Sequence, residues 1–74
     1  MAIVRKLEEI QLERDAPHKE VNATFTIVSG NDGNKYLQID TYGSKERQYE
    51  GKKSQSVRFA PEAINQLKKI LSQF

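Results

Sequence analysis

The chain has 74 residues and a formal net charge of +2, and it contains one histidine and no cysteine. A chain of this length forms one small domain, residues 1–74, and buries only roughly 60% of its unfolded surface. The absence of cysteine excludes disulfides, thiolate zinc sites and cysteine nucleophiles, and we expect no metal and no cofactor. Association with a second copy is the remaining way to enlarge the core, so the composition favours a homodimer.

The longest apolar run near the N-terminus is Ala2-Ile3-Val4, far shorter than the core of a signal peptide or a membrane span. We therefore expect a soluble, intracellular protein.

The N-terminal segment has a mixed pattern. Val4, Leu7 and Ile10 fit the spacing of a helix, whereas Ile10 and Leu12 fit a strand. We favour a strand over residues 3–14 that turns at residues 16–18, because a sheet of only two or three strands would be poorly covered.

Two further strands are predicted from alternating apolar and polar residues. From Val21 to Val28 the apolar residues recur at every second position, a pattern typical of a strand with one buried face. Asn31-Asp32-Gly33-Asn34 favours a hairpin turn, because these residues tolerate positive φ. In the next strand, residues 35–42, Leu37 and Ile39 point to one side while Tyr36, Gln38 and Tyr42 point to the other.

A short strand and a helix complete the chain. Val57 and Phe59 share one face of the strand. The helix begins at Pro61 and carries an apolar stripe. The stripe comprises Ala63, Ile64, Leu67, Ile70, Leu71 and Phe74. The predicted fold is α+β, with four strands followed by one C-terminal helix.

The candidate site combines a basic loop with the polar side of the sheet. Residues 43–58 hold five basic and two acidic residues. Cations interleaved with aromatic rings suit a ligand with a phosphate backbone and unpaired bases. The candidate nucleic-acid-binding residues are Thr24, Thr26, Tyr36, Gln38, Tyr42, Lys45, Arg47, Tyr49, Lys52, Lys53, Ser54, Ser56 and Arg58. Among the tyrosines we favour Tyr42 for stacking on a base, since it ends a strand beside Gly43.

Other functions have weaker support. The Gly51-Lys52-Lys53-Ser54 element lacks the spacing of a phosphate-binding loop of nucleotide hydrolases. No Ser, His and acidic set is organised for nucleophilic catalysis, so we expect no enzymatic activity. His18 is best explained as a solvated turn residue. The alternative is a dimeric protein-interaction domain whose basic loop docks an acidic partner.

The segment Val57-Arg58-Phe59-Ala60-Pro61-Glu62-Ala63-Ile64-Asn65-Gln66-Leu67-Lys68, preceded by Tyr36-Leu37-Gln38-Ile39-Asp40 and Gly51-Lys52-Lys53, resembles the positive cofactor four family of transcriptional coactivators. The resemblance covers roughly residues 21–72. It implies a curved four-stranded antiparallel sheet followed by one helix, a homodimer, and binding of single-stranded DNA through sheet ridges and basic loops. It also implies a place in the cytoplasm or nucleoid of a bacterial or phage-infected cell, or in the nucleus of a eukaryotic cell.

By position, the resemblance implies that Lys52 and Lys53 meet phosphate. The chain departs from the family in lacking a tryptophan near the end of the strand at 35–42, where Tyr42 or Tyr49 would stack instead. Lys53-Ser54-Gln55-Ser56 is also similar to the purine-rich-element binding repeats, whose ligand is again a single strand. The expected function is binding of single-stranded DNA, or alternatively RNA, with weak sequence preference, alongside transcription, replication or recombination proteins.

Overall fold

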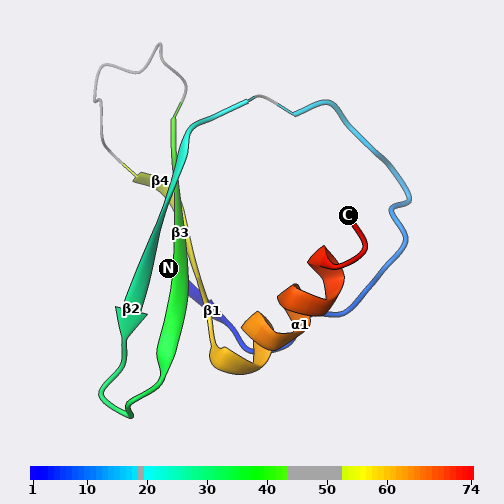
Figure 1. The fold of residues 1–74 in the computed structure, drawn as a ribbon. Coiled ribbons are helices and arrows are strands. Elements are labelled where there is room, and N and C mark those ends of the chain that lie inside the picture. Colours follow the sequence, from blue (N-terminus) through cyan, green and yellow to red (C-terminus); the bar gives the residue numbers. More distant parts are fainter. Residues whose placement is uncertain (19, 44–52) are drawn as a thin grey trace.

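A computed structural model describes residues 1–18, 20–43 and 53–74. The described elements are β1 (Ala2–Val4), β2 (Ala23–Ser29), β3 (Lys35–Tyr42), β4 (Lys53–Phe59) and α1 (Pro61–Leu71). The strands form one sheet in the order β1-β4-β3-β2, and α1 follows β4 (Figure 1). The predicted order of four strands and a C-terminal helix is therefore confirmed.

The β2–β3 hairpin forms where the alternating pattern predicts it. Its antiparallel register pairs Phe25 with Ile39 and Ile27 with Leu37, so these apolar side chains share one face. At the turn, Gly33 has φ of 80°, which a residue with a side chain adopts at a cost. The Gly30 amide donates to the Asn34 carbonyl at 2.8 Å and closes the turn.

The prediction of an antiparallel sheet is wrong at one edge. β1 pairs with β4 in parallel, so the sheet is mixed. The predicted strand over residues 3–14, with its turn at 16–18, is also wrong, because β1 ends at Val4. The physical reason is that Val4 pairs with Phe59, the last residue of β4, and the chain beyond it meets no further strand.

A side chain of α1 then holds the chain that leaves β1. The Gln66 amide accepts from the Leu7 N–H at 2.8 Å and donates to the Leu7 carbonyl at 3.0 Å. These two bonds satisfy both backbone groups of Leu7 as a strand partner would. Residues 8–18 and 20–22 form no strand or helix, and they arc from the region of α1 back to β2 (Figure 1).

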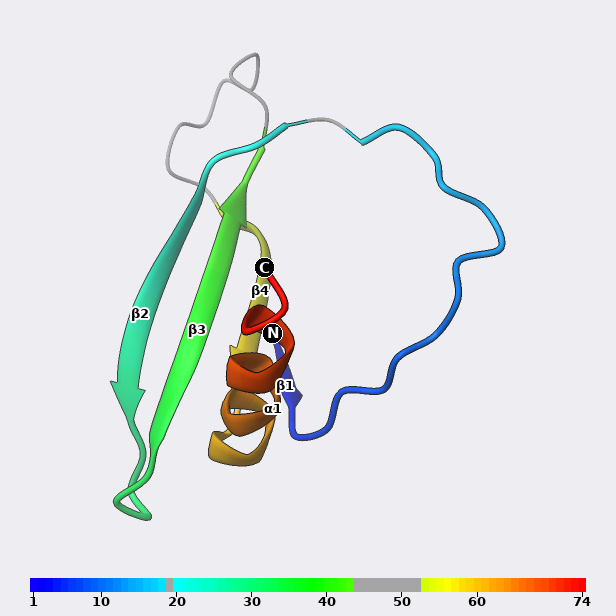
Figure 2. The same ribbon diagram turned by 45° about the vertical axis from the view of Figure 1, so that its right-hand side comes forward.

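The helix begins at Pro61 as its sequence predicts, and it ends at Leu71, before Phe74, the last residue of the predicted apolar stripe. Pro61 occupies the first turn together with Glu62, and Lys68 and Lys69 lie in the last turn, where each charge complements the helix dipole. α1 packs on β3 and β4 (Figure 2). Ala63 is fully buried, so the helix backbone approaches the sheet closely.

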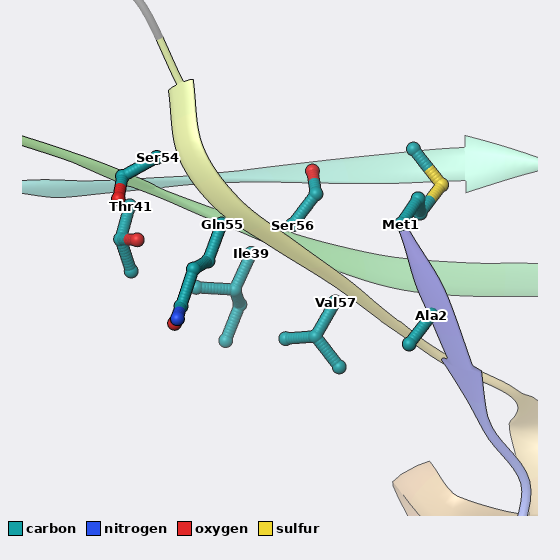
Figure 3. Close-up of a pocket in the computed structure, with 8 residues that line it drawn as sticks. All are labelled: Met1, Ala2, Ile39, Thr41, Ser54, Gln55, Ser56 and Val57. Carbon is teal, nitrogen blue, oxygen red and sulfur yellow. The ribbon is translucent and has the colours of Figure 1, made fainter.

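The apolar face of the sheet is incompletely covered. This face carries Phe25, Ile27, Leu37, Ile39, Val57 and Phe59. Phe25 and Ile27 in β2 are 71% and 64% exposed, and the described residues include no large side chain that is fully buried. Figure 3 shows a hollow of about 570 Å³ beside β4, where Ile39, Val57 and Ala2 point to one side of the sheet and Ser56 points to the other. The described chain thus leaves part of its core open.

The described residues contain no helix long and apolar enough to cross a membrane.

Candidate nucleic-acid interface

The opposite face of the sheet, here called the polar face, carries most of the predicted site residues. Its described members are Thr24, Thr26, Tyr36, Gln38, Asp40, Tyr42, Ser56 and Arg58. The register places Gln38 beside Thr26 and Arg58, and Asp40 beside Thr24 and Ser56. Figure 3 shows the Ser56 side chain pointing away from the side that Val57 and Ile39 share. Strand alternation therefore brings these polar residues together, as predicted.

Arg58 is fixed by a neutral partner. Its Nε and Nη2 atoms donate to Oε1 of Gln38 at 3.1 and 2.6 Å. Gln38 is only 6% exposed. The guanidinium has five N–H donors, so three remain for a ligand. Gln38, predicted as a contact residue, instead positions Arg58.

Asp40 is the centre of the polar face, although the sequence analysis did not include it among the site residues. The residue is 2% exposed, and its carboxylate accepts bonds from the Ser56 hydroxyl and from Nε2 of Gln38, the latter at 3.2 and 3.1 Å. Nζ of Lys53 lies 3.3 Å from Oδ2. An aspartate inside a strand is unfavourable unless its carboxylate has hydrogen-bond partners. The presence of Asp40 within the predicted strand was therefore the sequence signal for this network.

The hydrogen bonds keep Asp40 ionised. The bond from Ser56 lowers the pKa of Asp40 most, burial opposes this, and the bonds from Gln38 and Lys53 lower the pKa further. A carboxylate with these donors is a fixed anion at neutral pH. It holds the side chains of Ser56, Gln38 and Lys53 in place, and Gln38 in turn holds Arg58.

Two tyrosines lie near the two ends of β3. The Tyr36 hydroxyl donates to Oδ2 of Asp32 at 3.0 Å, and the Tyr42 hydroxyl lies 2.9 Å from Oγ1 of Thr24. Tyr42 lies six positions after Tyr36, which places their backbones about 20 Å apart along the strand. Because each hydroxyl is hydrogen bonded, both rings have a defined position on the polar face.

The remaining predicted residues have different placements. Ser54 lies at an irregularity, since Thr41 pairs with Gln55 and Tyr42 with Lys53, so Ser54 is left without a cross-strand partner. Lys53 is brought to the polar face by its contact with Asp40. Four predicted residues lie outside the described residues: Lys45, Arg47, Tyr49 and Lys52.

The charges of the described site are balanced. Arg58 and Lys53 supply two positive charges, and the carboxylates of Asp40 and Asp32, whose pKa values are both lowered, supply two negative charges. For Asp32 the largest cause is the hydrogen bond from the Asn34 backbone, followed by the bond from Tyr36. Both carboxylates are occupied by internal donors. The arrangement offers rings, hydroxyls and guanidinium donors to a ligand.

The described residues contain no cluster of His, Cys, Asp and Glu that could hold a metal ion. No protein-family model, curated protein or solved structure matches this chain, so its function has to be inferred from the site.

Proposed function

We propose that the protein is a non-enzymatic module that binds single-stranded DNA with weak sequence preference, as a homodimer. The observation that carries this proposal is the arrangement along β3. Tyr36 and Tyr42 lie near its ends on one face. Arg58 lies between them, beside Gln38, and Lys53 pairs with Tyr42 and reaches Asp40 on the same face. A flat ring stacks on an unpaired base of any sequence, while cations neutralise phosphate.

The spacing of these groups suits a short stretch of single strand. The backbones of the two tyrosines are about 20 Å apart along β3, and one strand of DNA carries one phosphate per about 3.4 Å when its bases are stacked. About six nucleotides would therefore span β3. Bases in a duplex are stacked on their neighbours, so the rings would reach them only at ends or after unstacking. This geometry favours a single strand over a duplex.

The homodimer is supported by the open apolar face. A monomer would expose Phe25 and Ile27 of β2, Leu71 at the end of α1 and Phe74 beyond the helix to water. Each large apolar side chain that becomes fully buried contributes about 1.5–3 kcal/mol. A second copy of the chain would cover this face and complete the core while leaving the polar face free for DNA.

The resemblance to the positive cofactor four family points to the same ligand and the same association. It implies a role beside transcription, replication or recombination proteins. The cations of residues 44–52 would add to the affinity for phosphate, since the described part of the polar face is balanced in charge.

A gel-shift comparison tests this function. A labelled single strand, the matching duplex and the same sequence as RNA are incubated with the protein at two salt concentrations. We expect a shift of the single strand that weakens with salt, little shift of the duplex, and an intact label throughout. Preferential binding of an acidic polypeptide instead would identify a protein-interaction domain, and degraded label would identify a nuclease.

A further inference from the structure

A second hollow lies on the polar face, at the end of the sheet that carries the β2–β3 hairpin, and residues of β1 and β4 complete its lining. Its volume is about 480 Å³, within the range of small-molecule sites. Ile3 and Val28 supply apolar lining, and Tyr36, Asp32 and Arg58 supply a ring, a carboxylate and a guanidinium. The register explains this assembly, because Ile3 pairs with Arg58 and Val28 with Tyr36.

The ring of Tyr36 is set in place before any ligand arrives. Its hydroxyl donates to Asp32 at 3.0 Å, and Asp32 also accepts from the backbone and side-chain amides of Asn34 at 3.0 and 3.1 Å. Gly30 permits this packing. A Cβ at Gly30 would lie 2.8 Å from the Tyr36 ring and 2.7 Å from an Asp32 oxygen, too close for either group to stay where it is.

The polar groups of the hollow favour different chemical groups of a ligand at its two ends. Arg58 keeps three N–H donors beyond its two bonds to Gln38, and a guanidinium binds phosphate strongly. The carboxylate of Asp32 repels phosphate from the hairpin end. An anionic group is therefore favoured beside Arg58, and a flat, uncharged group is favoured among Tyr36, Ile3 and Val28.

We propose that this hollow seats one unpaired nucleobase against Tyr36, Ile3 and Val28, with the phosphate of the same nucleotide on Arg58. The inference rests on the proposed function and names a subsite for it. It gives the parallel strand β1 a role in binding, since Ile3 reaches the polar face only through its pairing with β4. It also makes Tyr36 the principal stacking ring of the described residues.

The test compares two ligands of equal length, an oligothymidylate and a strand of abasic deoxyribose phosphates. The two strands share their charge and differ only in the bases. Their affinity ratio therefore measures the contribution of the bases, and it does not depend on where the protein sits along the strand. Stacking of a base on an aromatic ring corresponds to about a 5- to 150-fold difference in affinity.

We expect Tyr36→Ala to reduce the ratio by about 5- to 150-fold while leaving the affinity for the abasic strand unchanged. Tyr36→Phe keeps the ring and should retain most of the ratio. Arg58→Gln should weaken both strands together. An unchanged ratio in Tyr36→Ala, or an equal loss for both strands, would overturn the subsite while leaving single-strand binding intact. Binding of neither strand by the unaltered protein would overturn both proposals.

A measurement on the unaltered protein avoids any effect of substitution on folding. Thymidine 5′-monophosphate and deoxyribose 5-phosphate are added separately, and the methyl signals of Ile3 and Val28 are followed by NMR. Only the nucleotide should shift these methyls, together with the Tyr36 ring protons. Equal shifts with both compounds, or shifts with neither, would contradict a base in the hollow.

Discussion

The Nε and Nη2 atoms of Arg58 share a single acceptor, Oε1 of Gln38, at 3.1 and 2.6 Å. Because this acceptor is a neutral amide, it holds Arg58 in place without neutralising the positive charge of the guanidinium. Gln38 is oriented in turn by its bonds to the buried carboxylate of Asp40. Arg58 is thereby preorganised for an anionic ligand, which lowers the entropy that binding would otherwise cost.

Replacing Gln38 tests this preorganisation. Gln38→Met keeps the length of the side chain but removes the acceptor for Arg58 and the donor to Asp40. We expect the free energy of unfolding to fall by about 1–3 kcal/mol, because a buried hydrogen-bonding group loses its partner. Affinity for a single strand should fall as well. Thr26→Val, a neighbouring change on the same face, serves as the control for stability and should stay within about 0.5 kcal/mol.

Acid should weaken the fold through Asp40. Its pKa in the folded protein is lowered from the model-peptide value of 3.8, chiefly by the bond from Ser56. The stabilisation is therefore fully present above the unfolded pKa and is lost as the pH falls through the folded pKa. Unfolding by urea between pH 7 and pH 2 should show stability declining below about pH 4.

Asp40→Asn should reduce the slope of stability against pH in this acid range and lower the melting temperature at pH 7 by several degrees. Asp15→Asn removes an exposed carboxylate from the segment before β2 and serves as the matched control. If both variants followed the pH dependence of the unaltered protein, the buried network would not be the source of acid sensitivity.

Polar substitutions on the apolar face should dissociate the dimer. Phe25→Thr combined with Ile27→Thr changes two side chains that are 71% and 64% exposed in a single chain. In a monomer such surface changes would alter stability by only about 0.5 kcal/mol each. In a dimer they should halve the mass measured by light scattering and lower the melting temperature.

Ile10→Thr is the control for the dimer experiment, since Ile10 is equally exposed but lies outside the sheet. It should leave both mass and melting temperature unchanged. A monomer mass for the unaltered protein at micromolar concentration would end the dimer proposal.

The basic residues should set the salt dependence of binding. Replacing Lys52 and Lys53 by Ala should weaken binding to single strands of all sequences about equally. Each neutralised phosphate contributes roughly 0.7 to the slope of log affinity against log salt, so losing two should lower the slope by about 1.4. Titrations at four salt concentrations would measure it, and an unchanged slope would move the phosphate contacts away from these lysines.

The regular part of the fold was predictable because its signals are local. The alternation in β2 and β3 fixed which residues share a face, and Pro61 with the spacing of Ala63 and Leu67 fixed the helix. β1 was misread because its length depends on where β4 ends, a distant feature that residues 3–14 do not encode. The bond between Leu7 and Gln66 also depends on a distant part of the chain, since the two residues are 59 positions apart.

The candidate site was predictable only in its outline. Strand alternation placed Tyr36, Gln38 and Arg58 on one face, as expected. It did not reveal that Gln38 is buried or that Asp40 joins Ser56 and Lys53, because those contacts depend on the register of β3 against β4. Register follows from packing and turn geometry, which a sequence pattern specifies weakly for polar residues.

The most direct test of the central claim is to map a bound single strand onto the two faces of the sheet by methyl NMR. The methyls of Thr24, Thr26 and Val28 report on the polar face, and those of Ile27, Leu37 and Ile39 report on the apolar face. We expect a short oligothymidylate to shift the first set together with the Arg58 Nε–H signal and to leave the second set in place. Shifts confined to the apolar face, or no shift at a saturating concentration of strand, would contradict binding through the polar face.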